Sequence, residues 1–264
     1  MEAYLDNLFS LKGKMVLLTG ATGGIGSAFA KAMIEAGAKV ACCDIYKERL
    51  ENLKKSLGDN AYIFMLDMTE IESFAKIVEE ISQITGRIDV LINSAGINKR
   101  EGIVDVEETT YDRIMDVNLK GAFFLSSTVA PYMKAEGGGS IINVGSHTTG
   151  AALGGVSVYG ASKSALMALT QSQAIEWAKY NIRANCLSPG HIKTELTTVT
   201  WEHPQRSKYL LDRIPLDRPG YPEDLVGVAV LLASDASAYI TGQEIRIDGG
   251  FLAGGKPWPY DTAF

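Results

Sequence analysis

One short stretch limits the possible folds of this chain more than any other. Residues 14–19 form an apolar run, and a glycine-rich turn, GATGGIG, follows at residues 20–26. A helical pattern begins at once and ends near Gly37. In such a unit the backbone can approach a pyrophosphate that faces the helix N-terminus. A flexible turn is the alternative, but the flanking strand and helix favour a dinucleotide site formed by Gly20, Gly24, Ile25 and Gly26.

The expected second strand, residues 39–44, ends in Asp44, which lies 18 residues after Gly26. A carboxylate at about this spacing accepts hydrogen bonds from the adenosine ribose hydroxyls and repels a 2′-phosphate. Neither Gly23 nor Ile45 offers a cation that could hold such a phosphate. We therefore expect NAD, with NADP less favoured. The alternative is that Asp44 caps a helix over residues 48–57.

Two further strands are expected to end at the same edge of the sheet. Residues 61–66 lead to Asp67 and Met68, which we expect near the adenine, unless Asp67 only caps a helix over residues 71–84. Residues 88–92 lead to a short run of small residues that would let the ribose lie against the backbone. The expected cofactor contacts in this run are Asn93, Ala95 and Gly96.

Two polar side chains after the fourth strand have a functional and a structural interpretation. Arg100 could hold a substrate carboxylate through paired hydrogen bonds, or it could be a solvated loop charge. Asn118 lies in an apolar segment, residues 111–132, that we expect to form one long helix. A buried amide needs partners, because leaving it unpaired costs about 1–3 kcal/mol. Asn118 is therefore either a satisfied core amide or a bend in the helix that holds water beside Lys163.

The expected chemistry lies between Ser146 and Lys163. Ser146 follows an apolar run, residues 140–144, and Tyr159 and Lys163 are four residues apart. If Tyr159 opens a helix, this spacing places both side chains on one face. A nearby ammonium favours the phenolate and lowers the tyrosine pKa from about 10. These residues could therefore move a proton on and off a C–O group that Ser146 holds, with a nicotinamide taking the hydride.

Strands alternate with helices along the whole chain, with further strands expected at residues 183–187 and 244–247. This rhythm predicts an α/β fold: a single doubly wound domain, residues 1–264, with a seven-stranded, mostly parallel sheet and helices on both faces. Residues 192–214 lack a strong period and are expected to form a mobile lid over the substrate. The C-terminal tail, residues 251–264, contains prolines and aromatic residues, and leaving their apolar surface exposed to water would be unfavourable.

The composition excludes several classes of protein. The net charge of −6 over 264 residues argues against nucleic acid or an anionic membrane as the main partner. No stretch approaches the ~20 apolar residues of a membrane span, and no signal peptide is visible. The three cysteines and three histidines lack the spacing of metal ligands, so we expect no metal site and a cytoplasmic protein with reduced thiols.

The motifs occur in one order: the glycine-rich turn, Asn118 in VNLKG, Ser146, Tyr159 with Lys163, Pro189-Gly190 with Thr194, and Asp248-Gly249-Gly250. In this the chain resembles the short-chain dehydrogenase/reductase family along nearly its whole length. Asn93-Ser94-Ala95-Gly96 departs from the common NNAG, and Gly145 replaces a frequent serine, but no catalytic group is lost. The resemblance implies a Rossmann domain, a nicotinamide cofactor and a homotetramer whose C-termini meet neighbouring subunits.

The resemblance also implies a role for each motif residue. Tyr159 exchanges the hydroxyl proton, Ser146 binds the substrate oxygen, Lys163 binds the nicotinamide ribose and lowers the tyrosine pKa, and Asn118 maintains a water relay. The nicotinamide loop would contribute Pro189, Gly190, Ile192 and Thr194.

The expected substrate is small and polar. INKR and RIPLDRPGYPEDL resemble segments of gluconate 5-dehydrogenase-like members, and the expected substrate contacts are Arg100, Ser146, His147, Tyr159 and His191. We expect oxidation of a secondary alcohol in a sugar acid or polyol, or the reverse reduction. One alternative is a 3-oxoacyl-(acyl-carrier-protein) reductase, a class of enzyme that generally uses NADPH. The other is a non-enzymatic, nucleotide-sensing scaffold, which would be expected to have lost a catalytic residue.

Overall fold

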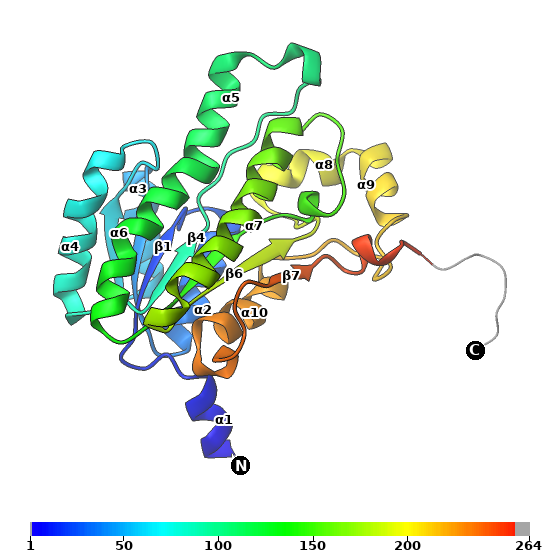
Figure 1. The fold of residues 1–264 in the computed structure, drawn as a ribbon. Coiled ribbons are helices and arrows are strands. Elements are labelled where there is room, and N and C mark those ends of the chain that lie inside the picture. The colour runs from blue at the N-terminus through cyan, green and yellow to red at the C-terminus, as the bar shows by residue number, and fades with distance from the viewer. Residues whose placement is uncertain (1, 257–264) are drawn as a thin grey trace.

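Seven strands form one sheet in the order β3–β2–β1–β4–β5–β6–β7, and every neighbouring pair is parallel (Figure 1). The computed structural model describes residues 2–256. The strands are β1 (Met15–Thr19), β2 (Lys39–Asp44), β3 (Ala61–Met65), β4 (Val90–Asn93), β5 (Gly139–Val144), β6 (Ile182–Pro189) and β7 (Glu244–Ile247). The expected seven-stranded sheet is confirmed, and it is fully rather than mostly parallel.

The sheet is buried on both faces, as the apolar strands require. Along β1, Val16 and Leu18 belong to one apolar cluster, and Met15 and Leu17 belong to the other. Successive side chains of a strand point to opposite faces, so one continuous apolar run supplies both layers. The first layer contains α2 (Gly24–Glu35), α3 (Lys47–Leu57) and α10 (Glu223–Ala233), and the second contains α4 (Phe74–Thr85), α6 (Gly121–Ala135) and α7 (Ser157–Trp177).

The strand order reverses between β1 and β4, which opens a crevice at the carboxyl ends of these two strands. In this arrangement β1 pairs with β2 on one side and with β4 on the other. Strands β1 and β4 both end at this crevice, and their last residues, Thr19 and Asn93, are paired in register. The predicted nucleotide and catalytic motifs follow these strand ends.

The segment expected to be one regular α-helix is helical throughout but contains a π-helical turn. It consists of α5 (Glu108–Met115), a π-helical turn (Asp116–Lys120) and α6, which follow one another without a break. Asn118 lies in the π turn. A π turn inserts one residue into a helix and is often found at functional sites. The sequence period predicted the helix but not this extra residue.

The segment expected to act as a lid is more regular than predicted. Residues 192–214 contain a 3-10 turn (Glu195–Thr197) and two short helices, α8 (Thr198–Glu202) and α9 (Pro204–Leu211). Both helices lie at the upper right of the view in Figure 1. Pro204 opens α9, where its missing N–H costs nothing. Turns this short give no clear period, which is why the pattern of the sequence did not predict them.

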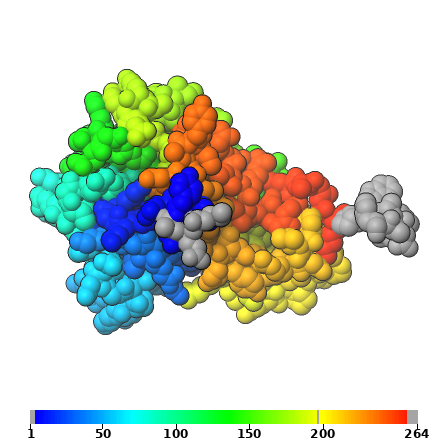
Figure 2. Space-filling view, turned by 90° about the horizontal axis from the view of Figure 1, so that it is seen from below, coloured from blue at the N-terminus to red at the C-terminus, as the bar shows by residue number. Residues whose placement is uncertain are grey.

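The first helix and the turn after the last strand lie at different sides of the molecule (Figure 1). Helix α1 (Glu2–Phe9) contacts the turn at Asp235–Ser237, and the blue and orange segments adjoin in Figure 2. After β7 a 3-10 turn, η8 (Phe251–Ala253), begins the tail, and Lys256 Nζ pairs with Asp217 Oδ1 at 2.6 Å. The rest of the tail, residues 257–264, lies outside the described residues. Within residues 2–256, no helix combines the length and apolar character needed to span a membrane.

Candidate functional site

The glycine turn approaches the backbone of the loop after β4. Gly20 has φ +65°, and a Cβ on it would lie 2.8 Å from Cα of Ala95. A Cβ on Gly26 would overlap the Gly20 carbonyl oxygen, and one on Gly24 would lie 3.0 Å from the Thr194 side chain. The turn therefore needs glycine for both its conformation and its packing. The bare turn and the N-terminus of α2, which begins at Gly24, fit a dinucleotide pyrophosphate.

Asp44 is the last residue of β2 and is 8% exposed. Its Oδ2 accepts hydrogen bonds from Thr22 N at 2.9 Å and Thr22 Oγ1 at 2.7 Å, while Oδ1 accepts one from Ile45 N at 2.7 Å. The carboxylate therefore faces the glycine turn, where a ribose could meet it. Helix α3 begins after Tyr46 without a side-chain cap, so the helix-capping alternative for Asp44 is wrong.

Two predicted cofactor residues after β3 have different environments. Asp67 Oδ1 accepts hydrogen bonds from Thr69 N at 2.9 Å and Thr69 Oγ1 at 2.8 Å, which stabilises the turn that it begins. Met68 is 4% exposed, and its side chain lies in the core against Gly121 of α6. Any contact of Met68 with a nucleotide would therefore involve its backbone rather than its side chain.

Asn93 also points away from the crevice. Its side chain is 2% exposed, and Nδ2 donates to Ser126 Oγ at 3.0 Å and to Asn143 Oδ1 at 2.8 Å. Thr19, which the sequence did not single out, shapes this loop instead, since its Oγ1 accepts from the N–H groups of Ser94 and Ala95, both at 3.1 Å. Any contact of Asn93 with a cofactor would therefore involve its backbone, as expected from the sequence of this run.

Asn118 connects the loop after β4 with α7. Its Oδ1 accepts from Ile97 N at 2.8 Å, and its Nδ2 donates to Ile97 O at 3.0 Å and to Ser162 Oγ at 3.1 Å. A Cβ on Gly96 would lie 3.4 Å from both Asn118 Oδ1 and Lys163 Nζ. Asn118 is therefore a satisfied buried amide, and it lies in the π turn of the helix. The water expected beside Lys163 stays a prediction.

Ser146, Tyr159 and Lys163 come together at the carboxyl end of β5. Ser146 is 4% exposed and interacts with the Tyr159 side chain, while Lys163 Nζ lies 5.7 Å from the centre of the tyrosine ring. Lys163 is 3% exposed and donates a hydrogen bond to Val144 O at 2.7 Å. Helix α7 begins at Ser157, so the four-residue spacing places the tyrosine and the lysine on one helical face, as expected.

The expected lowering of the tyrosine pKa does not occur in this structure. Burial raises the pKa of Tyr159, and the hydrogen bond with Ser146 offsets only part of this increase. Burial lowers the pKa of Lys163 to about 8, so its charge is itself disfavoured, and its ammonium is bonded to a backbone carbonyl. Proximity of a lysine is therefore not sufficient by itself to acidify the phenol.

The loop after β6 closes the site from the other side. Gly190 N donates to Ile247 O at 2.9 Å, and a Cβ on Gly190 would lie 2.5 Å from Cα of Asp248. Ile192 is buried and bridges Gly220, and Thr194 reaches the glycine turn at Gly24. The predicted nicotinamide loop, with Pro189 at the end of β6, is thus held between β7 and the first turn of α2.

The predicted substrate residues lie at neighbouring strand ends. The rings of His147 and His191 have centroids 4.3 Å apart, and both contact Phe251 of η8. Arg100 NH1 donates to Gly154 O at 3.1 Å, and its charge helps to lower the pKa of His191, which burial chiefly brings to about 3. The structure therefore brings both histidines together and places Arg100 at their rim.

Sequence reasoning missed a carboxylate beneath this region. Glu244 of β7 accepts hydrogen bonds from Ser188 Oγ at 2.8 Å, from Arg246 and from Thr149 Oγ1, which also donates to Ser146 O. Burial alone would raise the pKa of Glu244, but these hydrogen bonds outweigh it and lower the pKa. The only signal in the sequence was an acid at the start of a short strand, and its partners Ser188 and Thr149 lie far away along the chain.

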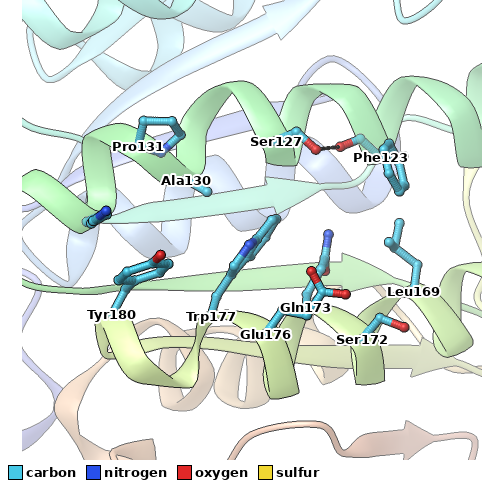
Figure 3. Close-up of a pocket in the computed structure, with 11 residues that line it drawn as sticks. Phe123, Ser127, Ala130, Pro131, Leu169, Ser172, Gln173, Glu176, Trp177 and Tyr180 are labelled. Atoms are coloured by element: carbon cyan, nitrogen blue, oxygen red, sulfur yellow. Dashed lines mark hydrogen bonds between the residues drawn. The ribbon is translucent and has the colours of Figure 1, made fainter.

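Among the residues that the structure describes, no cluster of histidine, cysteine and acidic side chains could hold a metal ion. A groove of about 500 Å³ lies between α6 and α7, where Trp177 and Tyr180 face Pro131 and Ala130 (Figure 3). On α7 this groove begins at Leu169, ten residues beyond Tyr159 and therefore about 15 Å along the helix. It is separate from the polar groups at the strand ends.

The chain is similar to known proteins over most of its length. A family model described as enoyl-(acyl carrier protein) reductase matches residues 20–252. A 2-dehydro-3-deoxy-D-gluconate 5-dehydrogenase from Dickeya dadantii is 41% identical over 94% of this chain and 98% of its own length. A 3-oxoacyl-(acyl-carrier-protein) reductase from Thermotoga maritima is 40% identical over 92% of this chain and 99% of its own.

A solved structure agrees with these sequence comparisons. A gluconate 5-dehydrogenase from Burkholderia cenocepacia, in complex with NADP and tartrate, superimposes with a TM-score of 0.90. It is 34% identical, and the match covers 95% of this chain and 99% of that one. The likeness therefore includes the fold and the whole sheet edge that carries the motifs.

Proposed function

The chain belongs to the short-chain dehydrogenase/reductase family, and on that premise we propose that it oxidises a secondary alcohol of a sugar acid or polyol with NAD, or catalyses the reverse reduction. Family membership makes it a nicotinamide-dependent oxidoreductase acting on CH–OH donors. The observation that carries the proposal is that the glycine turn, the loop after β4 and Lys163 adjoin one another. Gly20 packs on Ala95, and the next residue, Gly96, packs on Lys163. Lys163 thus lies beside the loop that packs on the glycine turn.

The proposed mechanism assigns one task to each residue. Tyr159 exchanges a proton with the substrate oxygen, and Ser146 holds that oxygen by a hydrogen bond. Lys163 would leave the Val144 carbonyl for the ribose of the cofactor, and its charge would then stabilise the phenolate. Asn118 holds the Ile97 backbone and Ser162 in place beside the lysine. A bound nicotinamide supplies the carbon that accepts or donates the hydride.

The preference for NAD rests on Asp44. Its carboxylate is nine-tenths buried at the glycine turn, where it would accept the ribose hydroxyls and repel a 2′-phosphate. Ala95, Gly96, Pro189, Gly190, Ile192 and Thr194 would line the rest of the cofactor groove. Because the Burkholderia cenocepacia neighbour is in complex with NADP, cofactor choice needs a direct test.

We propose a small polyhydroxylated substrate, with Arg100, His147 and His191 as contacts besides Ser146 and Tyr159. The support is the named activity of the Dickeya dadantii relative and the polar character of the strand ends. Residues 192–214 are proposed to cover the substrate, because Ile192 and Thr194 connect them to the cofactor loop. A 3-oxoacyl thioester is the second candidate, which the Thermotoga maritima relative favours and Asp44 disfavours.

The test is a panel of sugar acids, polyols, their keto forms and 3-oxoacyl thioesters, assayed by NADH and NADPH absorbance. We expect turnover of a sugar acid or polyol with kcat/KM at least about tenfold higher for NAD than for NADP, and a smaller preference in Asp44→Ser. Equal kcat/KM values with both cofactors would overturn the cofactor assignment. Reduction of the thioesters alone would favour the second candidate.

We further propose a homotetramer in the cytoplasm. The supporting surface includes the groove of Figure 3, which Phe123 of α6 lines at 46% exposure. Two more apolar side chains of these helices are exposed, Phe124 of α6 by 41% and Ile175 of α7 by 79%. Exposed apolar area of this kind is typical of interfaces. The three cysteines are free and buried, which agrees with a reducing compartment. Light scattering should give the mass of four chains, and Ile175→Asp should reduce it.

A further inference from the structure

Two imidazole rings meet at the carboxyl ends of β5 and β6. His147 follows Ser146, and His191 follows Gly190, so each ring adjoins a residue of the proposed reaction site. Their planes are inclined by 54°, and the Phe251 ring lies edge-on to both, with centroids at 5.4 Å from His147 and 4.8 Å from His191. Three consecutive strand ends, those of β5, β6 and β7, therefore converge on one cluster, which we call the histidine subsite.

Both histidines carry a buried nitrogen that has no partner. His147 is only 7% exposed, and neither its Nε2 nor that of His191 has a hydrogen-bond partner. Leaving a buried polar atom unpaired costs about 1–3 kcal/mol, which a fold rarely tolerates without a reason. A ligand that supplies the missing partner would recover part of this cost on binding.

The chemical character of one nitrogen follows from its neighbour. His147 Nδ1 lies 3.3 Å from the Pro189 carbonyl oxygen, which can only accept a hydrogen bond. Nδ1 must therefore carry the proton, and Nε2 of the neutral ring then holds a lone pair. A lone pair accepts from a hydroxyl group and repels a carboxylate. The ring is thus suited to an alcohol rather than to an acid group.

The surroundings keep the subsite uncharged. Burial lowers the pKa of His147, and burial, chiefly, with the Arg100 charge lowers that of His191 to about 3. The negative charge of Asp248 opposes both shifts without cancelling them. The neutral pair therefore lies next to a guanidinium, so a hydroxyl and an acid group would find separate partners. A sugar acid offers both groups, whereas a fatty acyl chain offers neither.

We propose that His147 and His191 form a subsite that binds a substrate hydroxyl group, with Nε2 of His147 as the hydrogen-bond acceptor. This inference rests on the proposed function, because it assigns the recognised group within the same site. Phe251 covers the subsite, since its ring lies against both imidazoles and both Nε2 atoms are buried. The substrate hydroxyl reaches the nitrogen only when this ring turns aside.

The tautomer can be tested without any substrate. Long-range ¹H–¹⁵N spectra of histidine-labelled protein at pH 7.5 distinguish a protonated Nδ1 from a protonated Nε2, and His147→Gln assigns the signal. We expect Nδ1 of His147 to carry the proton and Nε2 to shift when the best substrate of the panel binds to the NAD complex. A protonated Nε2, or no shift on binding, would contradict the inference.

Kinetics then test the recognised group. The best panel substrate is compared with its deoxy analogues, each lacking one hydroxyl that is not oxidised. We expect one analogue to lose about 10- to 100-fold in kcat/KM with the wild-type enzyme, because it leaves the nitrogen unpaired. In His147→Phe this discrimination falls toward one, and His147→Gln, which retains an acceptor, restores part of it. Tyr239→Phe is the control, because the Tyr239 side chain is fully exposed and lies outside the proposed site and the segment proposed to cover it.

The outcomes separate the two levels of the proposal. If no secondary alcohol or ketone in the panel is turned over, the proposed function fails. If turnover occurs but His147→Phe discriminates among the deoxy analogues as the wild type does, only the histidine subsite is wrong. A loss of discrimination in Tyr239→Phe of the same size would also overturn it, because the effect would not be specific to the buried ring.

Chemical modification tests whether Phe251 covers the histidine subsite. Diethylpyrocarbonate modifies neutral imidazole nitrogen, and mass spectrometry reports each histidine separately. We expect His147 and His191 to react at least about tenfold more slowly than His203 in the wild type, and Phe251→Ala to raise their rates toward that of His203 while leaving His203 unchanged. Rapid modification of both buried rings in the wild type would show that Phe251 does not cover them.

Discussion

The two halves of the sheet edge build their parts of the site in different ways. From β1 to β4, backbone atoms form the groove: Gly20 packs directly on Ala95, and Gly26 packs on the Gly20 carbonyl. From β5 to β7, side chains form the site, and Glu244 joins Thr149 to Ser188 beneath the reacting groups. A groove made of backbone tolerates few residue types, whereas a network of side chains can be assembled from many.

This difference determines how each half responds to substitution. In the first half an added methyl group meets backbone that cannot move without disturbing β1 or β4. In the second half a lost hydroxyl removes one hydrogen bond from a network that has others. We therefore expect steric substitutions to act mainly in the first half and polar substitutions mainly in the second. The following predictions test this comparison, from the largest expected effect to the smallest.

Tyr159→Phe should have the largest effect, because it removes the group proposed to exchange the proton while preserving the ring. We expect kcat to fall by about 10²–10⁴-fold, the usual contribution of a general acid or base. Binding of NAD, measured by calorimetry, should be unchanged, since the first half of the edge is intact. Tyr180→Phe, at the far end of α7, is the matched control. Substantial turnover by Tyr159→Phe would show that proton transfer does not depend on the second half.

Lys163 gives a prediction for the pH dependence of stability. Its pKa in the folded, cofactor-free protein is lowered from 10.5 to about 8, so between these values the unfolded chain binds more protons. The free energy of unfolding should therefore rise with pH from about 8 to about 10.5, by up to about 3 kcal/mol. Urea titrations of the wild type and of Lys163→Met over this range measure the difference. Parallel pH profiles of the two proteins would show that Lys163 is charged when buried.

The same contrast explains what the sequence could predict. The glycine turn, the strand that precedes it and the Tyr159–Lys163 pair are local patterns, and the structure confirms the elements that carry them. Strand β2 (Lys39–Asp44) and strand β7 (Glu244–Ile247) match the expected residues, whereas β6 extends beyond residues 183–187 because β7 pairs with it as far as Pro189. These features depend on period and spacing, which a sequence displays directly.

The parts that the sequence did not predict depend on contacts between distant residues. Thr149 and Glu244 are 95 positions apart, and nothing in either neighbourhood indicates the other. The orientation of Asn93 toward Ser126 and Asn143, rather than toward the crevice, likewise follows from the packing of α6 and α7 on the sheet. The raised pKa of Tyr159 reflects burial, which neither the spacing nor the identity of its neighbours reveals.

Gly20→Ala tests the backbone groove against a matched glycine. Gly13 and Gly20 both have positive φ, +81° and +65°, but a Cβ on Gly13 would meet nothing within 4 Å, whereas one on Gly20 would meet Ala95. Gly13→Ala should cost only the backbone strain of about 1–2 kcal/mol. Gly20→Ala should lower the free energy of unfolding further and also weaken NAD binding. Equal losses of stability and unchanged NAD binding in both variants would remove the distinction between strain and close approach.

Two adjacent threonines give the finest test of the side-chain half. Thr149 Oγ1 contacts Glu244 and Ser146 O, whereas Thr148 Oγ1 is buried and has no partner. Thr149→Val should lower the free energy of unfolding by about 1 kcal/mol, because the Glu244 carboxylate loses a donor. Thr148→Val should be neutral or stabilising, because it replaces an unpaired hydroxyl with a methyl group of similar size. Both free energies come from urea unfolding, and NAD affinity should be the same in the two variants. If Thr149→Val also weakened NAD binding as strongly as Gly20→Ala, the two halves of the edge would act as one unit, and the hydrogen-bond network around Glu244 would shape the cofactor groove as well as the position of Ser146.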